Sequence, residues 1–205
     1  MNFNRRHSLL IASGNSGKIE EIRLALSGLA VEIRTAADIG HLPEVAESED
    51  TLEGNARLKS ETLFQAAGLP VLSDDTGLEV AALGGDPGVR SARFAGEPSD
   101  QARNRALLLE LMAARTDRSA RFRTVVAFTD ESGTYLFDGS CDGVITCNGR
   151  GTGGFGYDEL FEPEGLDRTF AEIDPMLKNA ISHRGKALRL FVKFLTHHWK
   201  LGGSY

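Results

Sequence analysis

Apolar runs with two different spacings alternate along the first third of the chain, and this alternation constrains the fold more than any other feature. Ser8–Ala12 and Val31–Thr35 have the short patterns typical of buried strands. Lys18–Leu29 places apolar residues three or four positions apart, as on one face of a helix. Thr51–Ala67 repeats the helical spacing, and Val71–Ser73 is another short apolar strand. This order of strands and helices predicts a mixed α/β protein.

The remainder of the chain adds elements of the same two kinds. We expect a loop at 84–98, a helix from about Ser99 to Arg115 with Ser99 as N-cap, a hairpin of Phe122–Thr129 and Tyr135–Asp138, a strand at Gly143–Thr146, and a last helix from Ser182 to about Trp199. No linker rich in proline or serine divides residues 1–205. The chain is therefore expected to form a single domain, with a central β-sheet flanked by helices and two lobes with a cleft between them.

The composition points away from nucleic-acid binding and membrane insertion. The formal net charge is −6, whereas nucleic-acid-binding proteins usually carry a basic excess. No apolar run approaches the roughly 18 residues that a membrane helix needs. Cys141 and Cys147 lack the spacing of a zinc site. We therefore expect a reduced, cytoplasmic protein with neither nucleic acid nor membrane as partner.

A polar loop, Ser13-Gly14-Asn15-Ser16-Gly17-Lys18, follows the first expected strand. Such a turn directs backbone N–H groups and the helix dipole toward a bound phosphate. A Walker A loop would need glycine at position 12 and serine or threonine at position 19, where the chain has Ala12 and Ile19. The segment alone fits phosphate binding and an ordinary strand-to-helix turn equally well.

Two adjacent carboxylates, Asp74 and Asp75, follow the expected strand Val71–Ser73. Ligands of α/β sheets usually bind at the carboxyl ends of strands. Mg²⁺ is typically held by one or two carboxylates together with substrate phosphates, and a carboxylate is also able to orient or deprotonate a water. A turn with two solvated aspartates is the simpler alternative.

An acidic stretch precedes the second expected helix. Its members are Glu44, Glu47, Glu49, Asp50 and Glu53. One or two of them would complete a metal site, although acidic residues also favour a first helical turn without any metal. Lys59, within that helix, is a candidate phosphate ligand, but a lone helical lysine is ordinarily a surface residue.

Two further segments have the residue types of a base-binding site. The loop Gly151–Asp158 combines glycines, which allow a ligand to approach closely, with aromatic rings that offer a stacking face. Lys178, His183 and Arg184 lie around the start of the last expected helix, where they would donate hydrogen bonds to an anion or an oxo-purine. Each segment also has a purely structural reading, as a loop and as a helix terminus.

Four ordered blocks of the chain resemble the inosine triphosphate pyrophosphatase family, also called XTP/dITP diphosphatases. The similarity extends from Ser13 to about Ala187. The blocks are S-G-N-S-G-K at 13–18, L-S-D-D-T-G-L-E-V with A-L-G-G-D-P-G-V-R-S-A-R-F-A-G from 72 to 96, G-T-G-G-F-G-Y-D at 151–158, and K-N-A-I-S-H-R-G-K-A-L at 178–188. The resemblance implies an elongated α/β protein with a central mixed sheet. It also implies a homodimer that hydrolyses ITP, dITP and XTP to the monophosphate and pyrophosphate. Mg²⁺ would be its cofactor, with Mn²⁺ as a substitute.

The resemblance also implies roles for matching residues. Asp75 would be the general base, or the carboxylate that orients the water, and a Mg²⁺ ligand; Glu47, or less well Glu44, would share the metal. The implied substrate-binding residues are Ser13, Gly14, Asn15, Ser16, Gly17 and Lys18 for the triphosphate, Lys59 and Thr76 for further substrate contacts, Phe155, Gly156, Tyr157 and Asp158 for base and ribose, and Lys178, His183 and Arg184 for the base edge.

The chain departs from the family pattern at two places that bear on the site. The acidic segment of the family usually reads E-T-G-x-T-F-x-E-N-A, whereas residues 47–56 read E-S-E-D-T-L-E-G-N-A, with Gly54 in place of a glutamate. Glu159 stands where proline usually follows G-Y-D, a change expected to affect loop stiffness more than chemistry.

Two other kinds of function fit the same residues. One is a nucleotide hydrolase with a different base preference, or one that releases orthophosphate. The other is a nucleotide-binding protein without catalysis, in which Asp75 would be structural.

Overall fold

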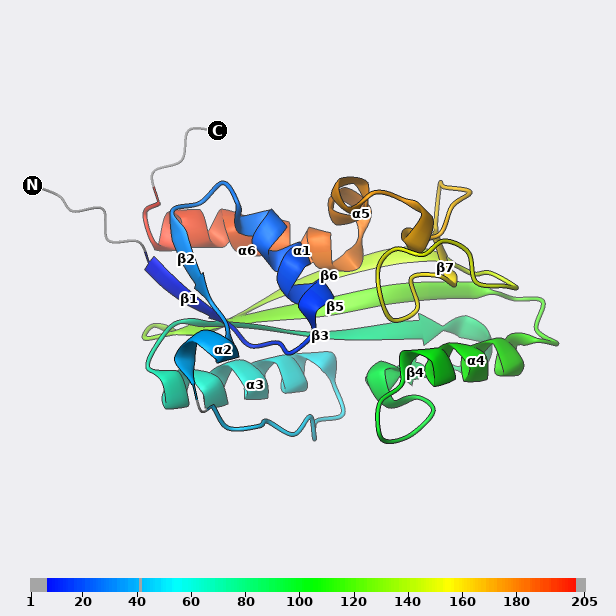
Figure 1. Ribbon diagram of the computed structural model, residues 1–205, viewed down its shortest axis with the longest axis horizontal. Helices are drawn as coiled ribbons and strands as arrows, with labels where there is room; N and C mark the ends of the chain where they lie inside the picture. The colour runs from blue at the N-terminus through cyan, green and yellow to red at the C-terminus, as the bar shows by residue number, and fades with distance from the viewer. Residues whose placement is uncertain (1–6, 41, 202–205) are drawn as a thin grey trace, which may run out of the picture. The chain divides into compact units, whose positions relative to one another are not determined.

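The computed structural model describes residues 7–40 and 42–201, which form a mixed sheet covered by helices (Figure 1). The strands are β1 (His7–Ile11), β2 (Val31–Arg34), β3 (Val71–Val80), β4 (Pro87–Gly88), β5 (Ser119–Asp130), β6 (Gly133–Ile145) and β7 (Phe161–Pro163). Their order is β2-β1-β3-β5-β6-β7, and β4 pairs with β3. The sheet is mixed because β1 runs parallel to β2 and β3, whereas β7 is antiparallel to β6.

Six α-helices lie within the described residues. They are α1 (Ser16–Leu26), α2 (Ala36–Ile39), α3 (Leu52–Ala67), α4 (Gln101–Met112), α5 (Pro175–Ile181) and α6 (His183–His198), and short 3₁₀ turns occur at Ala81–Leu83, Ser91–Arg93 and Phe170–Glu172. The predicted α/β class, with a central mixed sheet flanked by helices, is confirmed. Over the described ranges, every helix is too short or too polar to cross a lipid bilayer.

The described chain divides into two compact units. The first unit contains residues 7–40, 42–75, 125–138 and 187–201, and the second contains 76–124 and 139–186. The prediction of a single domain over 1–205 stays a prediction, and the ends of that range lie outside the described residues.

The core of the first unit follows from the two-residue period of β1. Leu9 and Ile11 pack in one apolar cluster with side chains of α1 and α6, whereas Leu10 and Ala12 pack in another with Leu63 of α3. Successive strand residues point to opposite faces of a sheet, so α1 and α6 cover one face and α3 covers the other (Figure 1). The continuous apolar sequence of β1 reflects burial on both faces.

The second unit has its own apolar core. Leu78 and Val80 of β3 and Leu108 and Met112 of α4 are fully buried in one cluster. The same cluster contains the aromatic rings of Phe122, Phe161 and Phe170. The cluster packs α4 against the sheet. Side chains of α4 also contact the glycine loop Gly151–Asp158.

The third strand is longer than its apolar sequence predicts. We expected Val71–Ser73 with Asp74 and Asp75 at its end, but β3 continues to Val80, so both aspartates lie within the strand. The strand continues through these polar residues because other elements satisfy them. Ser73 Oγ donates to the backbone oxygen of Ala56 at 2.6 Å, and both carboxylates have partners described below.

Two other expected boundaries were wrong. The segments 135–138 and 143–146 belong to one long strand, β6. The N-cap of α4 is Asp100, whose side chain accepts from the Arg103 N–H, whereas Ser99 donates to the Ala92 oxygen. The expected last helix, from Ser182 to about Trp199, is confirmed as α6, whereas the short helix α5 before it was not expected. Ser182 still acts as the expected cap, since its Oγ accepts from the Gly185 N–H at 3.1 Å.

The junction between α5 and α6 depends on the absence of a side chain at Gly185. A Cβ atom there would lie 1.7 Å from the backbone oxygen of Asn179, far inside van der Waals contact. This close approach fixes the positions of Lys178 on α5 and of His183 and Arg184 on α6.

We expect Gly185→Ala to destabilise the protein by about 3 kcal/mol, because a methyl group in this space forces backbone to move. Urea unfolding of wild type and variant measures the difference. Gly28→Ala is the control, since a Cβ at Gly28 meets nothing within 4 Å. Equal stabilities of the Gly185→Ala variant and the wild type would contradict the close packing at this junction.

Candidate active site

The polar loop before α1 is ordered by its own asparagine. Asn15 Oδ1 accepts hydrogen bonds from the N–H groups of Gly17 at 2.9 Å and Lys18 at 3.2 Å. The Asn15 N–H in turn donates to Ser13 Oγ at 3.2 Å. Asparagine is a favourable N-cap, which explains why the helix begins at Ser16. The cap also fixes the residue at which α1 begins, so Lys18 lies in the first turn of this helix.

Lys18 contacts a carboxylate of β3. Its Nζ lies 3.1 Å from Asp74 Oδ2, and the Asp74 side chain is 1% exposed. A buried carboxylate is costly unless it is paired and hydrogen-bonded, so this contact has a structural function in addition to any role with a ligand. The sequence did not predict this structural contact of Asp74, because its burial is visible only in the folded chain.

A second lysine of the first unit, Lys59 on α3, contacts the acidic segment. Its Nζ lies 2.6 Å from Glu47 Oε1 and donates to the backbone oxygen of Asp74 at 3.3 Å. Burial by itself would lower the pKa of Lys59, but the adjacent Glu47 carboxylate outweighs it, so this pKa lies above its usual value. Lys59 is therefore a positive charge held at the site.

Asp75 is a buried carboxylate beside these charges. It is 5% exposed, and its Oδ2 accepts from Asn55 Nδ2 at 3.2 Å. Burial and then repulsion by Glu47 raise the pKa of Asp75 to about 6, against the opposing effects of Lys18, Lys59 and Asn55. A carboxyl group with a pKa this close to neutrality is suited to accept a proton during a reaction.

Asn55 links Asp75 to the acidic segment. In addition to the Asp75 contact, its Nδ2 donates to the Glu49 backbone oxygen at 3.2 Å, and its Oδ1 accepts from the Glu49 N–H at 3.0 Å. Sequence reasoning missed this residue. The available signal was an asparagine on the buried stripe of α3, between Leu52 and Ala56, where an apolar residue would be ordinary.

The donor set of the first unit fits a divalent cation. Glu47 raises the pKa of Asp75 by repulsion, and a cation between two such carboxylates would relieve it. Within residues 7–40 and 42–201, no group of three or more His, Cys, Asp or Glu side chains forms a ready-made metal site. Mg²⁺ does not need one, because it is usually held by one or two carboxylates with waters and substrate phosphates. Glu44, the weaker candidate, is exposed.

The departure at Gly54 has a local explanation. A Cβ at Gly54 would lie 2.7 Å from Glu49 Cβ and 3.0 Å from Thr51 Oγ1. The quoted family pattern has glycine at the position of Glu49 and glutamate at the position of Gly54. The departures at Glu49 and Gly54 therefore compensate each other, because the side chain of Glu49 occupies the space that Gly54 leaves open.

In the second unit, Arg184 is held rigidly beside the glycine loop. The residue is 2% exposed, and its Nη2 donates to Thr76 Oγ1 at 3.0 Å. Thr76 Oγ1 also shares a 2.6 Å hydrogen bond with Thr124 Oγ1. The guanidinium carbon lies 5.5 Å from the centre of the Phe155 ring. The structure thus brings together Thr76, Phe155 and Arg184, and adds Thr124, which sequence reasoning missed.

Lys178 and Asp158 form a buried ion pair in the same unit. Lys178 Nζ lies 2.5 Å from Asp158 Oδ2 and 4.7 Å from the centre of the Phe155 ring. Asp158 Oδ2 also accepts from the Phe155 N–H at 2.8 Å. The carboxylate therefore fixes both the lysine and the turn that presents the Phe155 ring.

His183 and Tyr157 both pack against aromatic or apolar side chains of the second unit. His183 is 3% exposed and stacks on Phe122, with ring centres 4.5 Å apart. Tyr157 lies in the apolar cluster of the second unit, where its hydroxyl donates to the Ser91 backbone oxygen at 2.9 Å. Tyr157 thus anchors the glycine loop to the core, while Phe155 is the ring that contacts the two cations.

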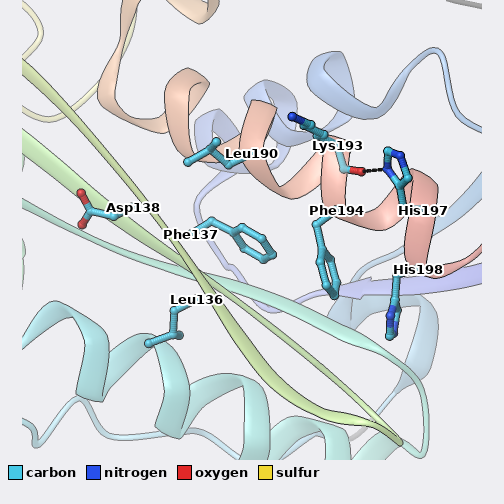
Figure 2. A pocket seen from close by; sticks show the side chains of 8 residues that line it. All are labelled: Leu136, Phe137, Asp138, Leu190, Lys193, Phe194, His197 and His198. Atoms are coloured by element: carbon cyan, nitrogen blue, oxygen red, sulfur yellow. Dashed lines mark hydrogen bonds between the residues drawn. The ribbon is translucent and has the colours of Figure 1, made fainter.

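A hollow of about 650 Å³ on the first unit contains none of the predicted site residues. Figure 2 shows the side chains that line it, on β6 and α6. They are Leu136, Phe137, Asp138, Leu190, Lys193, Phe194, His197 and His198. Its mainly apolar wall differs in character from the charged cluster around Asp75.

Comparison with known proteins identifies close relatives over almost the whole chain. The sequence profile of the Ham1 family matches residues 9–194. The chain is 44% identical to a dITP/XTP pyrophosphatase of Flavobacterium johnsoniae, with 92% of this chain and 97% of the relative covered. It is 47% identical to a dITP/XTP pyrophosphatase of Porphyromonas gingivalis, covering 91% and 96%.

Two solved structures of Ham1 proteins have the same fold as this chain. The Staphylococcus aureus Ham1 protein superposes with a TM-score of 0.84 at 36% identity, covering 93% of this chain and 99% of that chain. A HAM1 protein from Coxiella burnetii gives the same TM-score at 37% identity, with the same coverage. The resemblance inferred from the four sequence blocks is confirmed.

The raised pKa of Asp75 predicts how pH affects stability in the absence of metal. Folding favours the protonated carboxyl group, so its stabilising contribution is present below the unfolded pKa of 3.8 and is lost as pH rises through about 6. Asp75→Asn does not titrate. Relative to the variant, the wild type should therefore lose up to about 3 kcal/mol between pH 4 and 7.

Urea unfolding of both proteins in EDTA at several pH values measures this difference. Carboxylates that do not interact with Asp75 contribute equally to both proteins and cancel in the comparison. A constant difference in unfolding free energy across the range would contradict the raised pKa of Asp75.

Proposed function

This chain belongs to the Ham1 family, and from that premise we propose that it is a nucleoside-triphosphate pyrophosphatase. Its substrates are noncanonical purine nucleoside triphosphates, namely ITP, dITP and XTP, and its products are the monophosphate and pyrophosphate. The observation that supports this most directly is the buried Asp75 beside Glu47, Lys18 and Lys59. Such a cluster has the charges needed to bind phosphates and to position water.

The residues of the first unit have distinct tasks in this reaction. Lys18 and Lys59 neutralise the negative charge that develops on the pyrophosphate as it leaves. Asp75, ionised above its pKa of about 6, orients the water that attacks the α-phosphorus and accepts its proton. Asn55 holds the Asp75 carboxylate from the other side. Glu47 and Asp75 would hold Mg²⁺, or Mn²⁺ in its place, and the bound ion would add positive charge at the phosphates.

The second unit accounts for base selectivity. Phe155 offers a ring for stacking, and Lys178 and Arg184 place N–H donors around it. A donor satisfies the 6-oxo group of hypoxanthine or xanthine, whereas the 6-amino group of adenine is itself a donor. A buried donor that is left without an acceptor rejects the wrong base effectively. Because Arg184 is fixed by Thr76, its donors have little freedom to adapt to adenine.

Three further properties complete the proposal. The protein acts in the cytoplasm on small-molecule nucleotides, in agreement with its unpaired cysteines, Cys141 and Cys147. It binds neither nucleic acid nor membrane. It is a homodimer, as the family resemblance implies.

The first test is a panel of nucleoside triphosphates, with pyrophosphate and orthophosphate measured separately. We expect Mg²⁺-dependent turnover of ITP, dITP and XTP with pyrophosphate as the inorganic product, much slower turnover of ATP and GTP, and loss of activity in EDTA. Orthophosphate as the sole inorganic product would favour the other class of hydrolase. Binding without turnover would favour a non-catalytic nucleotide-binding protein.

The second test is Asp75→Asn, which removes a charge and a proton acceptor with almost no change in volume. We expect kcat to fall by about 10²–10⁴-fold, the usual effect of losing a general base. Glu47→Gln should raise the Mg²⁺ concentration needed for half-maximal activity. Mg²⁺ should also raise the Tm of the wild type more than that of either variant.

Glu44→Gln is the matched control, because Glu44 belongs to the same acidic segment but is exposed. Asp74→Asn is unsuitable, since Asp74 is buried against Lys18. If Asp75→Asn keeps more than about a tenth of the wild-type kcat, Asp75 is not the catalytic base.

A further inference from the structure

Two side chains of α4 hold the tip of the glycine loop from both sides. Gln101 Oε1 accepts from the Gly156 N–H at 2.8 Å, and Arg105 Nη1 donates to the Gly156 backbone oxygen at 2.9 Å. Gln101 and Arg105 are four residues apart, so they lie on one face of the helix. Both polar groups of one peptide residue are therefore hydrogen-bonded to the same helix.

The loop has little regular structure of its own at this point. The chain from 146 to 160 contains neither helix nor strand, and Gly154 and Gly156 have φ angles of +71° and +63°. Glycine adopts such angles without strain, but it is also the residue with the most freedom to lose. A loop of this kind keeps one conformation only if other parts of the protein fix it.

Arg105 makes a second contact, with the residue that follows the glycine loop. Its Nε lies 3.3 Å from Glu159 Oε2. Glu159 stands where proline is usual in the family pattern, and proline would stiffen the loop through its fixed φ angle. The ion pair joins the end of the loop to the helix that holds its tip.

We propose that Arg105 and Gln101 are positioning residues that set the affinity for the base, and that the Arg105–Glu159 pair holds the end of the same loop. This proposal rests on the proposed function, because it takes Phe155 as the ring that stacks on the base. Gly156 follows Phe155 directly, so the two hydrogen bonds on Gly156 limit the movement of that ring.

Loss of the α4 contacts to the loop should affect KM and leave kcat unchanged. A loop that must be ordered during binding weakens the complexes of substrate and transition state equally. Loss of such uniform binding raises KM and leaves kcat unchanged. Arg105→Met should therefore raise KM for ITP by about five- to tenfold, with kcat near that of the wild type. Gln101→Ala should act in the same direction with a smaller effect.

The test combines steady-state kinetics with amide hydrogen exchange of the metal-loaded protein. The Gly156 N–H should exchange faster in Arg105→Met and in Gln101→Ala. Glu159→Gln should have a smaller effect than Arg105→Met, since it removes the ion pair and leaves the Gly156 contact.

Arg121→Met is the matched control, because Arg121 also pairs with a carboxylate, that of Asp142, which lies outside the glycine loop. Unchanged exchange at Gly156 in Arg105→Met, or faster exchange with KM unchanged, would overturn the proposal. A wild-type protein that fails to hydrolyse ITP would refute the proposed function instead. The exchange rates would then still decide whether α4 holds the loop.

Discussion

The burial of two adjacent carboxylates on β3 is the constraint on which the first unit depends. Asp74 and Asp75 lie inside a strand with almost no exposure to water, and buried charges are tolerated only where partners compensate them. The compensation comes from Lys18 and Lys59, on two different helices, and from Asn55. The same arrangement concentrates positive charge and a carboxylate of raised pKa, so the groups that permit folding are also those proposed for catalysis.

A comparable arrangement orders the second unit. The pair of Lys178 and Asp158 is buried, and its carboxylate also accepts from the backbone of Phe155. Arg184 is held by a hydrogen bond to Thr76, and both Arg184 and Lys178 lie close to the Phe155 ring. Rigid donors discriminate between bases better than mobile ones, because they cannot adapt to the wrong hydrogen-bonding pattern. Close packing at Gly185 supports this rigidity.

Both departures from the family pattern have partners elsewhere in the structure. Gly54 leaves space that the side chain of Glu49 occupies, and Glu159 pairs with Arg105 of α4. Contacting residues commonly show coupled effects, so a change at one position alters the consequence of a change at the other. Each departure is therefore better understood as one half of a pair than as a single substitution.

The sequence by itself determined the α/β class, most of the helices and the family, because these depend on local periodicity and on ordered motifs. Predictions from the sequence failed where contacts with residues far along the chain override local preference. Asp74 and Asp75 had the composition of a turn, yet lysines and an asparagine from other helices keep them in a strand. The roles of Asn55, Thr124 and Arg105 were also invisible, since a hydrogen bond between residues 20 to 51 positions apart leaves no periodic signal. The chain fixes which groups are present, and only folding decides which of them are buried together and how strongly burial shifts the pKa of Asp75.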